Sequence, residues 1–443
     1  MKSGSKRTFA LSWHCVVSVF CWFLFDVIGF LQFHVQIEIG KIMDRIRLMK
    51  NVVQEYAWGS YTAIPELLGH DFPASTPQAE LWMGAHLKAS SMVKCDGVWR
   101  SLLELISKDP QDILGEKVAE KFDDRLPYLF KVLAAAKPLS IQAHPSLIQA
   151  KEGFERESRL GIPLDAYNRN YKDDNHKPEC ICAMTDFWAL NGFRKISGIL
   201  SLMDKICPPG MKTSLDLFRE QPDSMGLKNF FQAMMTMDGK QQEEIIADAI
   251  KNVQNFADDD PAYKWMINLH KEYPKDIGVF SPIMLNLICL KPGEAMFLPA
   301  GELHAYLDGV GIELMANSDN VLRGGLTPKY IDVQELLNVL NFEEREINIL
   351  LAGKIDECEC AYESLAEEFF LSVISVKDDI GYHSADSRNV EIILCTDGSA
   401  TITDLGKNDN VFVERGKSII IPAVVEKYRI KGNATFYKAA VPL

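Results

Sequence analysis

The sequence predicts a mainly β protein in which a helical segment interrupts the first β domain and a second β domain follows. Short apolar runs broken by turn residues extend from about residue 50 to 190 and return after Ile283, a pattern typical of β-rich domains. Between them, apolar residues recur at three-and-four spacing with almost no β-branched alternation, which predicts helices. The expected parts are a first β domain at 43–193 and 276–340, a helical insertion at 194–275 and a second β domain at 341–443.

Length and composition set the class of protein. The 443 residues are enough for two or three domains with hydrophobic cores. The net charge is −14 and no basic run occurs, which argues against a nucleic-acid partner. The ten cysteines are scattered without a CxxC spacing. This cysteine usage indicates a reducing compartment and argues against a zinc site made of cysteine thiolates.

The first 42 residues differ from the rest. A largely apolar run, Phe9–Val35, follows three basic residues and resembles a signal anchor. His14 and Asp26 interrupt the run, and no small-residue cleavage site is clear. We favour the alternative of a translated upstream extension with the true start at Met43 or Met49, and we therefore expect a cytoplasmic protein. A membrane-anchored form is the remaining alternative.

The stretch LSIQAHP, residues 139–145, reads as a strand with two polar residues on one face. Gln142 and His144 point one way and Ile141 and Ala143 the other, because side chains alternate with period two. For an isolated pair of this kind, two hydrogen-bonded core residues are the simpler explanation. The alternative is half of a metal site, which requires further ligands elsewhere in the chain.

Helices are expected in three regions. A helical patch lies near Leu102–Lys121, and the insertion carries four amphipathic stretches, with Pro261 in the first turn of the last one. A further helix is expected in YIDVQELLNVLNF, from Tyr330. The remaining segments after Ile283 read as strands and turns.

A second pattern supplies a histidine framed by turn residues. GEAMFLPAGELH, residues 293–304, has a glycine, five residues, Pro299, Gly301 and then His304. This spacing matches the second sequence motif of cupins, small double-sheet jelly rolls that often hold a metal in the barrel. A strand, a tight turn and a returning strand would deliver the imidazole inward, and a core histidine is the weaker alternative.

A carboxylate completes the set of candidate ligands. Glu179 follows Pro178 at the end of DDNHKPE and precedes the strand-like CICAM. Gln142, His144, Glu179 and His304 together offer nitrogen and oxygen donors without a thiolate, which suits Zn²⁺, although Mn²⁺, Fe²⁺ or Co²⁺ could bind as well. One coordination position would remain for water or substrate.

The C-terminal domain repeats part of this pattern. GKSIIIPAVVE has Gly416, five residues and Pro422, but Glu426 stands near the place of the histidine. We interpret this domain as a second, metal-free jelly roll with a structural role.

Several long motifs occur in the order found in one family. LSIQAHP, DDNHKPE, GELHAY and ELMANSDNVLRGGLTPKYIDV, with YAWGS and AELWMGAH nearer the N-terminus, resemble the type I phosphomannose isomerases, which are zinc-dependent cupins. The resemblance extends from about Val52 to the C-terminus. It implies interconversion of mannose 6-phosphate and fructose 6-phosphate through a cis-enediol with one zinc ion per subunit. It also implies a phosphosugar substrate and no obligatory protein partner, and we expect a monomer.

The resemblance also assigns residues. It places the zinc ligands on Gln142, His144, Glu179 and His304 and the catalytic arginine on Arg323. Further positions that line the family's substrate cleft fall on Lys131, Ser140, His176, Lys177, Glu313, Asp319 and Lys329.

The roles of these residues follow from their charge and spacing. Lys177 lies two residues before Glu179 and should share its face, where a metal would favour the neutral amine. Glu313 is the rival base, and each could instead be an ordinary ion-pair partner. His176 should point to the opposite face from Lys177 and Glu179. It is therefore better suited to opening the sugar ring, or to orienting a group near the metal through a hydrogen bond. Lys131 and Ser140, and more weakly Lys329, are candidate phosphate donors, with a snorkelling strand lysine as the alternative for Lys131.

Three rival functions remain at this point. A cupin dioxygenase would need iron, for which Gln142 is an unusual ligand. A silent metal cupin that senses sugar phosphates would bind without turnover. An isomerase of another phosphosugar would differ only in the shape of its cleft. Mannose catabolism and the supply of activated mannose, as in GDP-mannose biosynthesis, both fit the family.

Overall fold

The computed structural model describes residues 43–363, 365–377 and 379–442, and the predictions for the first 42 residues lie outside it. Within the described residues, no helix combines the length and apolar character needed to cross a membrane. Met43 and Ile46 are buried, and Arg47–Lys50 form strand β1. Of the two starts proposed above, only Met43 retains these buried residues.

The first β domain is organised around one long strand, β14 (His304–Ala316). Its second half pairs antiparallel with β8 (Tyr128–Ala135) and β10 (Glu179–Ala183), and its first half pairs with β11 (Phe187–Phe193) and β9 (Ile141–Ala143). The sheet is completed by β2 (Val52–Gln54), β3 (Glu80–Met83), β12 (Leu285–Leu290), β13 (Glu294–Leu298), β15 (Leu322–Gly325) and β16 (Leu350–Leu351). Three segments of a predicted metal site therefore lie on neighbouring strands.

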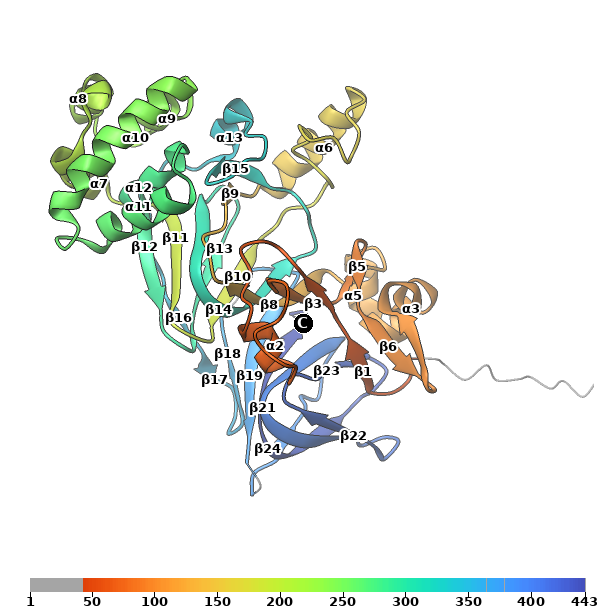
Figure 1. Cartoon of the computed structure of the whole chain (residues 1–443). Helices are drawn as coiled ribbons and strands as arrows, with labels where there is room; N and C mark the ends of the chain where they lie inside the picture. The colour runs from red at the N-terminus through yellow and green to blue at the C-terminus, as the bar shows by residue number, and fades with distance from the viewer. Residues whose placement is uncertain (1–42, 364, 378, 443) are drawn as a thin grey trace, which may run out of the picture. The chain divides into compact units, whose positions relative to one another are not determined.

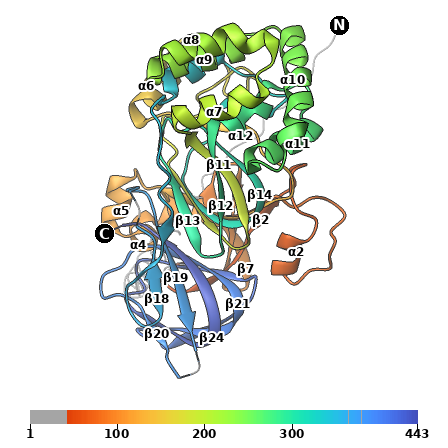
Figure 2. The ribbon, with the colours of Figure 1, turned by 90° about the vertical axis from the view of Figure 1, so that its left-hand side faces the viewer.

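The insertion is helical, as its spacing predicted. It consists of α7 (Ile196–Ile206), α8 (Lys212–Glu220), α9 (Ser224–Met235), α10 (Gly239–Val253), α11 (Pro261–Glu272) and the short α12 (Ser281–Met284), drawn in green in Figures 1 and 2. Asp260 caps α11 by accepting from the backbone N–H of Ala262, with Pro261 in the first turn as expected. The helical part continues to Met284 rather than to 275.

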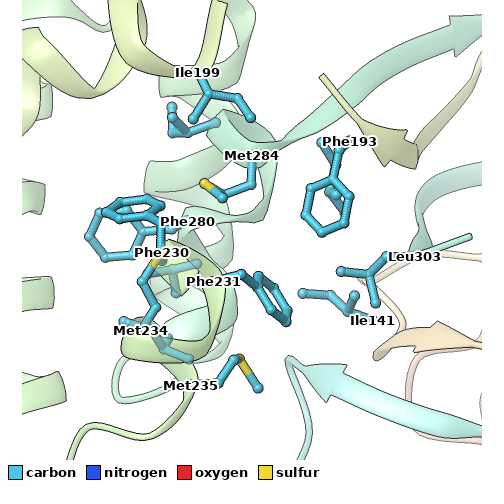
Figure 3. Packing of buried hydrophobic residues seen from close by; sticks show 14 of the residues in the cluster. Ile141, Phe193, Ile199, Phe230, Phe231, Met234, Met235, Phe280, Met284 and Leu303 are labelled. Carbon is cyan, nitrogen blue, oxygen red and sulfur yellow. The ribbon is translucent and has the colours of Figure 1, made fainter. Parts of the chain in front are cut away.

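The core of the insertion packs against the strands that carry the site. Phe193, Phe231 and Met284 belong to a cluster that also includes Ile141 and Leu303, and Figure 3 shows these side chains facing one another. Ile141 and Leu303 each immediately precede a predicted ligand in sequence. Because side chains alternate along a strand, the apolar neighbours face the helices while the ligands face the barrel interior.

The second sheet crosses the predicted domain boundary. Its order is β17 (Gly353–Lys354), β18 (Glu359–Ala361), β19 (Phe370–Val376), β24 (Tyr428–Ala440), β21 (Glu391–Asp404), β23 (Ser418–Ile421), β1, β6 (Met92–Cys95) and β7 (Val98–Ser101). Leu48 of β1 stands opposite Ile419, and Met49 stands opposite Val93. The N-terminal segment thus extends the C-terminal sheet, although we assigned it to the first domain by sequence.

Two further differences concern helices. The patch at Leu102–Lys121 forms three short helices, α3 (Leu102–Lys108), α4 (Pro110–Leu114) and α5 (Glu116–Lys121), separated at a proline and a glycine. Helix α6 (Leu147–Arg159) lies in a region where we expected strands, and Ser146 and Gln149 form a capping box at its start. The helix expected from Tyr330 is α13 (Val333–Val339), which begins after its cap, Asp332.

Candidate metal centre

Three of the four predicted ligands converge in the interior of the first β domain. Ligand atoms of His144, Glu179 and His304 lie within 4.8 Å of one another, and all three residues are buried. Nε2 of His144 is 3.3 Å from Oε1 of Glu179, and Nε2 of His304 is 3.5 Å from Oε2. The two oxygens of one carboxylate therefore each face one imidazole.

Gln142 lies beside this group on the central strand of three. On β9 it stands directly opposite His304 of β14 on one side and opposite Arg323 of β15 on the other. Directly opposed residues point to the same face of an antiparallel sheet. The amide, one ligand imidazole and the predicted catalytic guanidinium thus share one face, as the alternation in LSIQAHP indicated.

Backbone carbonyls fix the orientation of both imidazoles. Nδ1 of His144 lies 2.7 Å from the carbonyl oxygen of Asn320, and Nδ1 of His304 lies 3.0 Å from that of Glu302. A carbonyl oxygen only accepts, so each Nδ1 must donate and each neutral Nε2 carries a lone pair. Among the described residues, both Nε2 atoms are buried and have no hydrogen-bond partner.

The donor set fits a metal cation. Two nitrogen lone pairs face two carboxylate oxygens, so four electron-rich atoms surround one point without protons between them. This is the mixed nitrogen and oxygen set that zinc accepts, and Gln142, opposite His304 in the strand register, could add an amide oxygen to it. Contacts from each ring to a backbone carbonyl are the usual support for metal-binding histidines.

Burial and charge keep the ligands in their metal-binding forms. Burial, followed by the positive charge of Lys177, lowers the pKa of His144 to about 4. Burial would raise the pKa of Glu179, but the positive charge of Lys177 holds it well below its ordinary value. At neutral pH the imidazole is therefore neutral and the carboxylate ionised, which is what metal binding requires.

Two glycines allow the site strands to approach closely. Gly301 has φ +79°, and a Cβ atom there would lie 3.0 Å from the carbonyl oxygen of Val339. Gly324 packs so tightly that a Cβ atom would lie 3.0 Å from Leu303 and 3.3 Å from Ile141. The glycines of LRGG, which by themselves suggest a turn, therefore let β15 dock beside β9 and bring Arg323 to the site.

Arg323 is held near the ligands without a counter-charge of its own. The residue is half-buried, and its Nε atom is buried with no hydrogen-bond partner among the described residues. Burial lowers the pKa of Arg323 from its ordinary value. A guanidinium nevertheless stays charged at neutral pH. An uncompensated donor at this place suits an anionic ligand.

The two candidate bases differ in their partners. Nζ of Lys177 is 2.7 Å from Oε1 of Glu179, at the ligand group itself. Glu313 is buried on β14 and accepts from Nζ of Lys131 at 2.6 Å, and Lys131 also lies 3.8 Å from Glu80. Burial raises the pKa of Glu313 against the opposing charge of Lys131.

The candidate phosphate donors are separated by the fold. Lys131 is buried between two carboxylates, which raise its pKa despite burial. Its charge is therefore already balanced by Glu313 and Glu80. Desolvation, Arg323 and Lys88 lower the pKa of Lys329, which places three cations near one another. Ser140 lies half-buried immediately before β9.

The remaining predicted residues also have defined partners. Asp319 is 2.9 Å from Nζ of Lys88 and 3.6 Å from Nε2 of His86. His176 directs its Nε2 to Glu368, a residue distant in sequence, at 2.5 Å. Asp319 and His176 are thus held in place by side chains that the sequence motifs did not single out.

Sequence reasoning missed the loop that supports these groups. Asp173 accepts from the hydroxyl of Ser318 and the backbone N–H of Asp319, each at 2.7 Å. Nδ2 of Asn320 donates to the carbonyl oxygens of Asp173 at 2.8 Å and Asn175 at 2.9 Å. Since the carbonyl of Asn320 also orients His144, this asparagine links two ligand segments. Runs of Asp and Asn such as DDNH and NSDN favour such turn contacts and were the available signal.

The sequence matches two family models. Residues 46–196 match the catalytic domain of type I phosphomannose isomerase, and residues 211–285 match the helical insertion domain of the same family. Mannose-6-phosphate isomerase of Escherichia coli strain K12 is 42% identical over 387 residues, covering 86% of this chain and 96% of the relative. The rat mannose-6-phosphate isomerase is 33% identical over 89% of this chain and 98% of the relative.

Solved structures give the same result. The crystal structure of mannose 6-phosphate isomerase from Salmonella typhimurium, bound to its substrate fructose 6-phosphate and zinc, superposes with a TM-score of 0.84 at 38% identity. It covers 90% of this chain and the whole of the other. A zinc-bound holo structure of mannose 6-phosphate isomerase agrees equally well, with a TM-score of 0.84 and the same identity and coverage.

Proposed function

The chain belongs to the type I phosphomannose isomerase family, and we propose that its buried His144, Glu179 and His304 group is the centre at which it acts. The chain is a zinc-dependent isomerase that interconverts mannose 6-phosphate and fructose 6-phosphate. The observation that carries the assignment of the centre is that the two Nε2 atoms face the oxygens of Glu179 and have no hydrogen-bond partner within the described part of the chain. The reaction moves a proton between C2 and C1 of the open sugar through a cis-enediol.

The ligand assignment rests on chemistry that this chain supplies. Gln142, His144, Glu179 and His304 would hold zinc, with both rings oriented by backbone carbonyls. When bound, zinc supplies a Lewis acid that stabilises negative charge developing on the sugar oxygens. Arg323, fixed on the same face as Gln142, adds a second positive charge for the same oxygens.

We assign the proton transfer between C1 and C2 to Lys177. A base must first be within reach of the reacting carbon, and only then does its pKa matter. Both candidates are ion-paired, Lys177 with Glu179 at 2.7 Å and Glu313 with Lys131 at 2.6 Å. Of the two, Lys177 is the one whose partner belongs to the ligand group. Lys177 takes the proton from one carbon and returns it to the other. The role of the Lys131–Glu313 ion pair is electrostatic, because it fixes the charges on the neighbouring strands β8 and β14.

Exchange of solvent deuterium distinguishes the two bases. We expect Lys177→Ala to lower the rate of deuterium incorporation at C1 of fructose 6-phosphate by about 10²–10⁴-fold, the usual contribution of a general base. Glu313→Gln should reduce it far less, and Lys131 would still face Glu80 in that variant. NMR of the sugar measures the exchange, with thermal melts and zinc content as controls. A larger loss in Glu313→Gln would reverse the assignment.

Phosphate binding and ring opening complete the proposal. Lys329, whose charge interacts with those of Arg323 and Lys88, offers a cation for the phosphate dianion, Lys88 offers a second, and Ser140 offers a hydroxyl. His176 accepts the proton of the O1 hydroxyl as the C1=O1 bond forms and the C1–O5 bond breaks. It then passes this proton to O5.

The domain boundaries at 194–275 and 341–443 stay predictions. So do the monomeric state, the cytoplasmic location and the absence of an obligatory protein partner. The absence of a membrane-crossing helix within the described residues is compatible with that location.

A coupled assay tests the function directly. Zinc-loaded protein incubated with mannose 6-phosphate should produce fructose 6-phosphate, and a chelator should stop production until zinc is restored. Glucose 6-phosphate, run in parallel, tests the alternative of an isomerase for another phosphosugar. Binding of mannose 6-phosphate without product would instead favour a sensor, and no product from the zinc-loaded protein would refute the isomerase assignment.

A further inference from the structure

The C-terminal domain contributes a carboxylate to the site. Glu368 lies between β18 and β19, in the segment predicted by sequence to belong to a structural, metal-free domain. Its Oε1 atom is 2.5 Å from Nε2 of His176, although the two residues are 192 positions apart in sequence. A carboxylate oxygen accepts, so Nε2 of the imidazole must carry the proton that is shared.

Glu368 is held as an ion chiefly by its contact with His176, with smaller contributions from a backbone hydrogen bond and from Lys121. The residue is buried, and its second oxygen, Oε2, has no hydrogen-bond partner among the described residues. Burial would raise the pKa of Glu368, but the hydrogen bond from His176 keeps it below its ordinary value. A buried carboxylate is costly unless it is paired, so the imidazole and the carboxylate fix each other.

The backbone of His176 is fixed from the opposite side. Its N–H donates to Oδ1 of Asn175 at 3.0 Å, and the loop before it is bound by Asp173 and Asn320. The next residue, Lys177, reaches the ligand Glu179. The catalytic domain thus holds the main chain of His176, and the C-terminal domain holds its ring.

We propose that Glu368 is a positioning residue for the isomerase reaction, which orients His176 by binding Nε2–H and leaves Nδ1 as the nitrogen that takes the substrate proton. This inference rests on the proposed function, in which His176 opens the sugar ring. It gives the second jelly roll a part in catalysis: the domain supplies the residue that decides which imidazole nitrogen is basic. Glu368 itself does not touch the substrate.

The adjacent residue is a matched control. Glu367 lies one position earlier in the same segment, its side chain is 76% exposed, and it pairs with Lys121 at 3.0 Å on the surface. Glu367→Ala removes a carboxylate of the same size from the same loop without removing the contact to His176. Any effect seen for Glu368 and not for Glu367 is therefore specific to the buried contact.

Steady-state kinetics provide the first test. Glu368→Ala should lower kcat for mannose 6-phosphate by about 10–100-fold, as the loss of an orienting partner does for metal-bound histidines, with an unchanged KM and unchanged zinc content. Glu368→Gln, whose amide oxygen can still accept from Nε2–H, should retain most of the activity. Glu367→Ala should match the wild type. Wild-type kcat in Glu368→Ala, or loss of zinc from it, would overturn the proposal.

A double-mutant cycle separates positioning from general stability. If Glu368 acts through His176, then Glu368→Ala should change kcat by no more than about twofold in a His176→Ala background, because the two residues form one unit. A residue needed only for folding would lower activity equally in both backgrounds. Equal losses in both backgrounds would thus contradict the proposal.

Nitrogen NMR tests the contact without catalysis. In protein labelled with ¹⁵N-histidine, the signals absent from His176→Ala identify this ring. We expect protonated Nε2 in the wild type and in Glu368→Gln, and a mixture of both neutral tautomers in Glu368→Ala. If the zinc-loaded wild type failed to convert mannose 6-phosphate, the proposed function would be refuted. The NMR measurement would still show whether Glu368 determines the tautomer of His176. An unchanged tautomer in Glu368→Ala would refute the positioning role.

Discussion

His304→Ala is expected to lose zinc and, with it, isomerase activity. The residue is fully buried, and its Nε2 atom faces Glu179 at 3.5 Å while Nδ1 is bound to the carbonyl of Glu302. A structural zinc site contributes about 10–16 kcal/mol at neutral pH. One ligand of four therefore accounts for about 3 kcal/mol, or roughly a hundredfold in affinity. The alanine also leaves a cavity beside an ionised carboxylate.

Zinc content after gel filtration, measured by atomic emission, checks this expectation. His383→Ala is a suitable control because His383 is exposed on β20 (Tyr382–His383) of the C-terminal sheet, and it should keep both zinc and activity. Stoichiometric zinc in purified His304→Ala would show that this imidazole is not a ligand.

Arg323→Ala should keep zinc and lose most of its kcat. The guanidinium stands opposite Gln142 with its Nε unpartnered, so its removal leaves the ligands and their supporting carbonyls in place. The loss of one preorganised donor to a developing oxyanion typically costs about 10²–10³-fold in kcat. A lysine would restore the positive charge but not the planar guanidinium with its several fixed N–H donors. Arg323→Lys should therefore recover only part of the rate that Arg323→Ala loses.

Kinetics and zinc content measured together separate the roles of His304 and Arg323. Arg159→Ala, which removes an exposed arginine of α6 paired with Glu155, provides the control for loss of a cation. Equal loss of zinc from His304→Ala and Arg323→Ala would contradict the division between a ligand and a charge-stabilising residue.

The candidate site was largely predictable because its signals are local. Gln142 and His144 share a face through the period of a strand, and His304 is delivered by a turn that requires Pro299 and Gly301. Those relations involve residues that are neighbours in sequence, so they do not depend on how distant segments of the chain pack. Family resemblance added Arg323, which the spacing of LRGG alone would have assigned to a turn.

Contacts between distant segments were not predictable in the same way. Lys131 has the character of a phosphate donor in sequence, yet the register of β8 and β14 places it opposite Glu313, which neutralises its charge. We missed helix α6 because the short apolar runs around it predicted strands, although Ser146 and Gln149 form a capping box at its start. Strand β1 joins the C-terminal sheet because Ile46 and Leu48 pack with its core, a preference that its four residues do not reveal.

The sequence alone thus determined the β character, the helical insertion and the family, and it predicted the three residues that converge at the candidate metal centre. Each of these depends on side-chain periodicity, turn residues or long motifs, which are properties of continuous segments. Only the tertiary structure decided which charges cancel, as in Lys131 with Glu313, and which remain uncompensated, as in Arg323. It also brought Glu368 to His176 across 192 positions. The physical reason is that the energy of a buried charge depends on its partners in space, and those partners are fixed by strand register and domain packing rather than by neighbouring residues.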